Sequence, residues 1–212
     1  VAFGDQYTYL TGSSESLIDY YSKLARRLVD RFRLGPGDAV IEIGSNDGTF
    51  LRAFQSLGID VLGIEGAQKS SEIAVAAGIP VIEQFFGKGL AITAKDRLRP
   101  GSRIRLIVAM NVLAHTDNIN EFLDETTKLM GPDTVFVSQS HWLAALVRNF
   151  EFDTIYHEHL RYYTLASLMG LFQRHGLFIT DAEITDFYGG SILTYATPAT
   201  QDQSPNMMSI LA

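Results

Sequence analysis

Hydrophobic residues recur along the chain with two different periods, and their alternation predicts the fold. Residues 16–33 carry leucine and aromatic side chains at helical spacing, and the Gly-Pro-Gly run at 35–37 ends this helix. The short apolar runs that follow indicate strands at 39–43, 59–64, 79–83, 104–109 and 134–138. The segments between them are typical of helices, at 48–57, 70–77, 90–98 and 119–130.

Strands that alternate with helix-length segments indicate parallel βαβ units, and near-continuous apolar strands indicate a sheet covered on both faces. The last third of the chain departs from this alternation. We expect a helix at 141–148, an irregular stretch at 149–164, a helix at 165–175 and strands at 177–184 and 191–196. The pattern predicts an α/β, Rossmann-like fold whose sheet has about seven strands, mostly parallel and flanked by helices, with the last one or two antiparallel.

The length of 212 residues suits one domain with small additions. We divide it into an N-terminal loop and helix cap at 1–38, a ligand-binding domain at 39–196, and a polar tail at 197–212 that is expected to be disordered. The absence of cysteine excludes disulfides, thiolate zinc sites and cysteine nucleophiles in these residues.

The charge and hydropathy of the chain narrow the expected partners. A net charge of −7 with scattered basic residues disfavours nucleic acid. The sequence has neither an apolar run of membrane-spanning length nor a basic-then-apolar start. We therefore expect no membrane partner and a cytoplasmic location.

The clearest candidate for a binding site follows the first predicted strand. Residues 42–48 read Glu-Ile-Gly-Ser-Asn-Asp-Gly, and a helix follows at once. Ligands of doubly wound sheets bind beyond the carboxyl ends of the strands, and glycine lets the backbone turn sharply and approach them. The next strand ends at Glu65, 21 residues after Gly44, where a ribose-binding carboxylate is expected.

Two cofactors compete for this turn. A dinucleotide site has the spacing G-x-G-x-x-G and rests a pyrophosphate on the helix N-terminus. Here the spacing is G-x-x-x-G, with Glu42 before the first glycine and Asp47 inside the turn. An acidic turn repels a pyrophosphate but suits a ligand with ammonium and sulfonium charges, so we favour a methyl donor over a nicotinamide cofactor. A turn without any ligand is the alternative, because strand-to-helix turns also need glycine.

The acid-x-Gly-x-x-x-Gly pattern resembles the first motif of class I methyltransferases, which use S-adenosyl-L-methionine. Further along, the third strand runs into two phenylalanines that can flank an adenine ring, with ordinary core packing as the alternative. The fourth strand ends at Asn111, the usual floor of a methyl-donor pocket. The predicted donor-binding residues are Glu42, Gly44, Ser45, Asn46, Asp47, Gly48, Glu65, Gln84, Phe85, Phe86 and Asn111.

The segment 152–163, Phe-Asp-Thr-Ile-Tyr-His-Glu-His-Leu-Arg-Tyr-Tyr, is the most specific in the chain. Such a row of polar side chains is costly to bury without a function. It resembles the C-methyltransferases that add branching methyl groups to nucleotide-linked deoxysugars in antibiotic pathways. The likeness extends to IEIGSNDGTFLRAF at 41–54, GIPVIEQFFG at 78–87, NVLAHTDNINEF at 111–122, Tyr-Thr-Tyr at 7–9 and Gly-Gly-Ser at 189–191.

The resemblance implies an S-adenosyl-L-methionine-dependent methyltransferase domain at 39–196 that acts on a small metabolite, of which a keto-deoxysugar is the family's example. The acceptor carbon lies next to a carbonyl, and loss of its proton gives an enolate that takes the methyl group. Histidine can take such a proton near neutral pH. By resemblance the base is His159, with Glu158 and Tyr156 as its partners and with His115, Tyr9 and Tyr7 toward the acceptor.

The remaining histidines have simpler interpretations. His157 is expected at the surface, and His141 and His175 are expected to be structural. The spacing of His157 and His159 allows a shared metal only on a strand, and no third ligand is evident, so we expect no metal.

The chain also departs from the family. Family members usually begin with a cysteine-bound zinc module and end with a second nucleotide-binding-like domain, and neither is present in this sequence. Tyr188 and Leu193 stand where the family often has His and Arg, and an arginine is the natural clamp for a phosphate. The alternatives are therefore an O-methyltransferase, with His159 or His115 deprotonating a hydroxyl, or a non-catalytic donor-binding domain.

Overall fold

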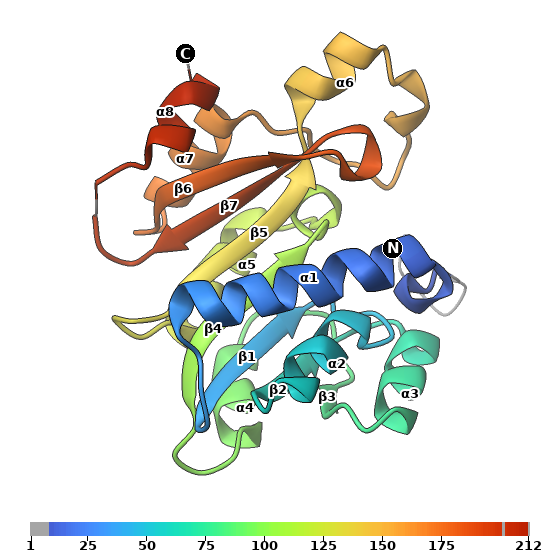
Figure 1. The fold of residues 1–212 in the computed structure, drawn as a ribbon, viewed down its shortest axis with the longest axis vertical. Helices are drawn as coiled ribbons and strands as arrows, with labels where there is room; N and C mark the ends of the chain where they lie inside the picture. The colour runs from blue at the N-terminus through green and yellow to red at the C-terminus, as the bar shows by residue number, and fades with distance from the viewer. Residues whose placement is uncertain (1–8, 201, 212) are drawn as a thin grey trace. The chain divides into compact units, whose positions relative to one another are not determined.

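The structure is a computed structural model that describes residues 9–200 and 202–211. The chain divides into two compact units, an N-terminal unit at residues 1–108 and a C-terminal unit at residues 109–212. The sheet has seven strands in the order β3-β2-β1-β4-β5-β7-β6, which confirms the predicted fold class (Figure 1).

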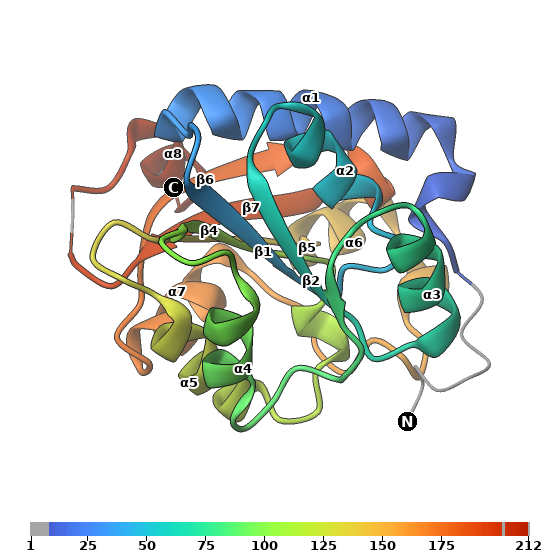
Figure 2. The same ribbon diagram turned by 90° about the horizontal axis from the view of Figure 1, so that it is seen from below.

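In the N-terminal unit the strands pair in parallel, β1 with β2 and β4, and β2 with β3. Helices separate the strands along the chain, as the alternation of apolar runs predicts (Figure 2). The elements are η1 Thr11–Ser13, α1 Glu15–Phe32, β1 Asp38–Ile43, α2 Thr49–Ser56, β2 Asp60–Ile64, α3 Gln68–Ala76, β3 Val81–Ile82, α4 Leu90–Arg97 and β4 Arg103–Met110, the last of which runs across the unit boundary.

Helix α1 shows why this sequence forms this element. The Ser14 side chain accepts a hydrogen bond from the Leu17 N–H and so caps the first turn, and Arg33 ends the helix in the left-handed conformation. The buried side of α1 carries Leu24 and Leu28, and its Tyr21 ring stacks on Phe50 of α2 with ring centroids 4.7 Å apart. This packing fixes α2, whose first residues follow the predicted glycine turn directly.

In the C-terminal unit, β7 runs antiparallel to both of its neighbours, β5 and β6, as the expectation of one or two antiparallel strands allowed. Strand β5 extends to His141, so this histidine ends a strand instead of beginning a helix. The elements are η2 Leu113–His115, α5 Ile119–Leu129, β5 Val135–His141, α6 Leu143–Asn149, η3 Phe152–Thr154, α7 Leu165–Gln173, β6 Phe178–Thr185, η4 Phe187–Gly189, β7 Ser191–Thr197 and α8 Pro205–Leu211.

The polar tail differs from the expectation of disorder, because α8 forms within it and packs against β6 and α7 (Figure 1). The Met207 side chain is completely buried, and the Met207 N–H donates to the Ser204 hydroxyl at 3.1 Å. Pro205 occupies the first helical position, where its fixed φ favours a helix start. A helix this short gives too little hydrophobic periodicity to be recognised within a polar segment.

Among the described residues, no helix combines the length and the apolar character that crossing a membrane requires.

We predict that Met207→Ala lowers the free energy of unfolding by about 2 kcal/mol or more, because it leaves a cavity in a packed interior. Met208 is the matched control, because its side chain is 55% exposed and its replacement by alanine should change stability by no more than about 0.5 kcal/mol. Urea unfolding of both variants measures the difference. Equal effects of the two substitutions would contradict the buried position of α8.

Candidate functional site

The predicted glycine turn lies between β1 and α2 in the N-terminal unit. Gly44 and Gly48 have φ angles of 72° and 74°, in the left-handed region that glycine adopts without strain. The Gly44 N–H donates to the Ile64 carbonyl at 2.8 Å, which ties the turn to the end of β2. A Cβ at Gly48 would lie 3.0 Å from the Ile79 side chain, so the glycine is also required by close packing.

Three carboxyl groups are buried around this turn, those of Glu42, Asp47 and Glu65. Glu65 accepts the N–H groups of Asn46, at 2.8 Å, and Ala67, at 2.7 Å. Burial raises the pKa of Glu65, although these backbone hydrogen bonds oppose the shift.

Of the three carboxyl groups, that of Glu42 lies in the environment least favourable to a negative charge. Burial raises its pKa well above the ordinary value, and repulsion by Glu65 and Asp47 raises it further. Within the part of the chain that the structure describes, the Glu42 Oε2 and Ser45 Oγ atoms are buried without a hydrogen-bond partner. Unpartnered buried oxygen atoms of this kind require an explanation, and a cationic ligand with donor groups supplies one. The turn therefore fits the ammonium, sulfonium and hydroxyl groups of S-adenosyl-L-methionine.

The aromatic residues after β3 lie beside the end of β2. The Phe85 ring packs against Gly66, where a Cβ would come within 2.4 Å of the ring, and 53% of Phe85 is exposed. Gln84 is exposed and Phe86 is half-buried. A ring next to the Glu65–Gly66 corner offers a face for an adenine.

The side chains of Asn46 and Asp47 have a second role that the sequence did not indicate. Asn46 Oδ1 accepts the Thr11 N–H at 2.9 Å, and Asn46 Nδ2 donates to the Tyr9 carbonyl at 2.9 Å. Asp47 Oδ2 accepts the Gly12 N–H at 2.7 Å. The segment before α1 is therefore bound to the glycine turn. Tyr7, also predicted to face the acceptor, lies outside the described residues.

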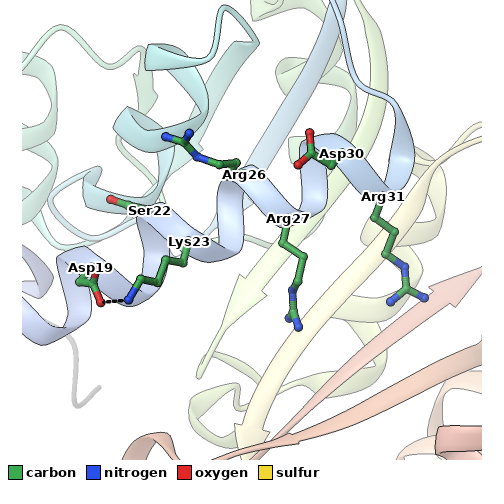
Figure 3. Close-up of a pocket in the computed structure, with 7 residues that line it drawn as sticks. All are labelled: Asp19, Ser22, Lys23, Arg26, Arg27, Asp30 and Arg31. Carbon is green, nitrogen blue, oxygen red and sulfur yellow. Dashed lines mark hydrogen bonds and ion pairs between the residues drawn. The ribbon is translucent and has the colours of Figure 1, made fainter.

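A shallow depression along the exposed face of α1 is a different feature. Its charged and polar lining contains no residue of the glycine turn, and the Lys23 ammonium donates to Asp19 at 2.7 Å across one helical turn (Figure 3). Charges of both signs at helical spacing are typical of a solvated helix face. The lining residues are Asp19, Ser22, Lys23, Arg26, Arg27, Asp30 and Arg31.

The predicted base His159 and its partners belong to the C-terminal unit, where the segment 158–163 is bound to the loop after β4. The Leu160 N–H donates to the Ala114 carbonyl at 2.9 Å, and the Tyr163 hydroxyl donates to the Leu113 carbonyl at 3.3 Å. The Arg161 guanidinium donates to the carbonyls of Thr116 and Asp117. These bonds bring His115 and His159 together although they are far apart in sequence.

His159 is buried, and its two ring nitrogens have different partners. Nδ1 lies 2.8 Å from the Thr154 carbonyl oxygen, which can only accept, so Nδ1 carries the proton. The lone pair is then on Nε2, which lies 3.3 Å from the Tyr156 hydroxyl. Burial raises the pKa of Tyr156, so its phenol stays protonated and donates to His159. A neutral imidazole held in one tautomer can act as a base.

Three imidazole rings form one cluster. The His115 and His141 rings each lie 4.7 Å from the His159 ring, between centroids, and the Tyr188 ring lies 5.8 Å from that of His141. Burial lowers the pKa of His115, while burial and then the charges of His159 and His115 lower that of His141 to about 4. Both rings are therefore neutral near neutral pH.

His141 is the residue that sequence reasoning missed. It was expected to be structural, yet its ring has no hydrogen-bond partner in the described parts of the chain and lies against the predicted base. The position of His141 in the chain offers a clue to such a role. It ends a strand, and ligand sites in this class of fold lie at the carboxyl ends of the strands.

Glu158 and Asn111 are the remaining predicted residues of the candidate site. The Glu158 backbone carbonyl, and not its carboxylate, is the partner of the His115 ring, 2.6 Å from Nδ1. Asn111 has a left-handed φ of 58°, and its buried Oδ1 has no partner among the described residues. The other two histidines lie outside the cluster, since His157 is exposed and His175 is bonded to Asp124 and Asn120. No group of side chains suited to holding a metal ion occurs within residues 9–200 and 202–211.

The strand order, the antiparallel β7 and the acidic glycine turn after β1 define the class I methyltransferase fold. The model of the methyltransferase domain family matches residues 17–182, and the chain belongs to this family.

Among similar proteins, the C-methyltransferase NovU of Streptomyces niveus is 35% identical over 214 residues, which cover 100% of this chain and 50% of that protein. A ubiquinone biosynthesis O-methyltransferase of Rhodopseudomonas palustris is 27% identical over 115 residues, 54% of this chain and 42% of the relative. The chain thus spans about half the length or less of these relatives. A solved structure of magnesium protoporphyrin IX methyltransferase from Synechocystis, with bound SAH, has a TM-score of 0.63 at 15% identity and covers 93% of this chain and 91% of its own.

We predict that affinity for S-adenosyl-L-methionine decreases as the pH falls through the raised pKa of Glu42, because the cationic donor binds the ionised carboxyl best and its binding releases a proton. Calorimetry in two buffers of different ionisation enthalpy measures the released proton. Glu42→Gln should weaken binding and remove this proton release. Binding without proton release, and an affinity that does not change with pH, would contradict the assignment.

A second prediction concerns His141 and stability. Its pKa is lowered from 6.5 to about 4, so in this window the unfolded chain binds a proton that the folded chain does not, and stability decreases as the pH falls. In His141→Gln this loss of stability between pH 6.5 and 4 should be smaller, by up to about one proton in the pH slope of the free energy of unfolding. Urea titrations across the window measure the slope, and an unchanged slope would contradict burial of a neutral His141.

Proposed function

We propose that the protein transfers a methyl group to a carbon next to a carbonyl group of a small metabolite, with His159 as the base. The observation that carries this proposal is the fixed tautomer of His159. The Thr154 carbonyl holds Nδ1–H, and the lone pair on Nε2 lies beside the Tyr156 hydroxyl. The 35% identity to a protein named as a C-methyltransferase supports the same chemistry.

S-adenosyl-L-methionine supplies an electrophilic methyl group on a sulfonium. The residues of the chain make the nucleophile. His159 Nε2 takes the proton from the acceptor carbon, and the electron pair of the broken C–H bond passes into an enolate. The proton then resides on the His159 ring, whose other nitrogen keeps its hydrogen bond to Thr154.

The developing enolate oxygen needs hydrogen-bond donors. Tyr156 can turn its hydroxyl from His159 to this oxygen, since its raised pKa keeps the phenol protonated. His141 can add a ring N–H, because its low pKa keeps the imidazole neutral and none of its ring nitrogens is engaged within the described residues. His115 holds the segment through its bond to the Glu158 carbonyl and so positions the base.

The charges of the cluster favour an acceptor that is itself uncharged where it contacts these rings. The lowered pKa values of His115 and His141 keep these two rings neutral, and the nearby Arg161 guanidinium is occupied by two backbone carbonyls. A phosphate would require a free cationic clamp. A keto-deoxysugar, which presents a carbonyl and hydroxyl groups, suits this environment.

O-methylation is the second candidate, and the match to a ubiquinone biosynthesis O-methyltransferase favours it. In that reaction His159 or His115 would take the proton of a hydroxyl group. The two reactions differ in one property that can be measured, because only C-methylation breaks a C–H bond in the acceptor.

We predict that the protein with S-adenosylhomocysteine exchanges deuterium from the α-carbon of a deuterated 4-keto-6-deoxyhexose into water, as followed by NMR. His159→Asn should slow this exchange by about 100-fold or more, because it removes the base but keeps a polar side chain of similar size. The matched control is His157→Asn, two residues away and exposed, which should exchange at the rate of the unaltered protein. Exchange that survives in His159→Asn would eliminate this base, and methylation of a hydroxyl without exchange would establish the O-methyltransferase.

A further inference from the structure

Residues 9–12, which we call the N-terminal strap, precede α1 and are bound to the glycine turn by three hydrogen bonds. The Asn46 side chain makes two of them, accepting the Thr11 N–H and donating to the Tyr9 carbonyl, both at 2.9 Å. Asp47 makes the third by accepting the Gly12 N–H at 2.7 Å. The bonded groups of the strap are all backbone groups, so these bonds depend on the backbone conformation of the strap and not on its side chains.

Asn46 takes part in this arrangement with both its backbone and its side chain. Its backbone adopts a left-handed φ of 49°, which asparagine tolerates better than most residues. Its own N–H donates to Glu65 Oε2 at 2.8 Å, and both ends of its side-chain amide are used by the strap. Each end of the amide keeps one further hydrogen-bonding position, so a direct contact with a donor molecule has to be separated from the coupling by experiment.

The fit between strap and turn is close at Gly12. A Cβ at this position would lie 2.9 Å from both Asp47 Oδ2 and Thr49 Oγ1. These two residues are themselves joined, because the Thr49 hydroxyl donates to Asp47 Oδ1 at 2.6 Å at the start of α2. A side chain at position 12 therefore forces the strap and the Asp47 and Thr49 side chains apart.

We propose that Asn46 is a positioning residue that couples the N-terminal strap to donor binding. Glu65, the candidate ribose carboxylate, holds the Asn46 backbone, and the Asn46 side chain holds the strap. Donor binding that fixes Glu65 and Asp47 thus favours the bound strap over the released strap. By linkage, the bound strap raises the affinity of the turn for the donor by the same factor. The hydrogen bond from Asn46 to the Tyr9 carbonyl also positions the backbone of Tyr9, which is predicted to face the acceptor. The inference rests on the donor site alone and is independent of C-methylation by His159.

The first test uses the unaltered protein with S-adenosylhomocysteine as the probe. We expect hydrogen exchange at the Thr11 and Gly12 amides to slow by about tenfold or more at saturating ligand, because opening of the strap then requires the ligand to be lost. Exchange rates that are the same with and without the ligand would overturn the proposal.

The second test disrupts the hydrogen bonds between the strap and the turn, with one substitution in the strap and one in the turn. Gly12→Ala leaves every residue of the turn unaltered, and Asn46→Gly removes the side-chain bonds while keeping a residue suited to a positive φ. Both should accelerate exchange at Thr11 and Gly12 and weaken S-adenosylhomocysteine binding by roughly tenfold, the effect of losing one to two hydrogen bonds. Ser13→Ala, which removes only the bond from the Ser13 hydroxyl to the Leu10 carbonyl, is the control and should bind normally.

The two variants separate coupling from direct contact. If Asn46→Gly weakens binding while Gly12→Ala, with fast exchange in its strap, binds as the unaltered protein does, Asn46 contacts the donor directly and the proposal fails. Normal binding by both variants with accelerated exchange would also overturn it. Circular dichroism checks that each variant is folded, and if Gly12→Ala is not, the exchange measurement on the unaltered protein still decides.

Discussion

The burial of three carboxyl groups around one tight turn is the constraint on which the N-terminal unit depends. Water does not reach Glu42, and Glu65 and Asp47 add repulsion to the loss of hydration. Backbone N–H groups from Asn46, Ala67 and Gly12 compensate two of the carboxyl groups, but Glu42 keeps an oxygen atom without a partner among the described residues. The turn is thus built to be completed by positive charge, and its glycines are needed because Gly44 and Gly48 have positive φ angles and a Cβ at Gly48 would meet the Ile79 side chain.

In the C-terminal unit the buried titratable groups include histidines, whose pKa is lowered by burial and not raised. Desolvation raises the pKa of a buried acid but lowers that of a buried imidazole, so His115 and His141 stay neutral where a solvated histidine would be partly charged. The same desolvation keeps the phenol of Tyr156 protonated, so the cluster combines an acceptor lone pair with proton donors.

Much of the fold could be predicted from the sequence, because most of the described strands contain a short apolar run and most of the described helices begin or end at a glycine or a side-chain cap. The exceptions have local causes. Strand β3 is shorter than its apolar run, Val81–Ile82 instead of residues 79–83, and α8 lies in a segment too short and polar for periodicity to reveal. In the candidate site, the sequence indicated the residue types of the turn and of segment 152–163. It did not reveal His141, whose partners are distant in sequence, or the strap, whose bonded atoms belong to the backbone.

One carbonyl oxygen sets the chemistry of the predicted base. The Thr154 oxygen receives both the His159 Nδ1–H and, at 3.0 Å, the Tyr162 hydroxyl, while the Thr154 side chain donates to the Glu151 carbonyl instead. The tautomer of the imidazole is therefore imposed by the peptide backbone, not by a carboxylate partner of the kind found in catalytic triads. Because a peptide carbonyl belongs to the main chain, the hydrogen bond that orients the ring does not depend on the identity of any neighbouring side chain.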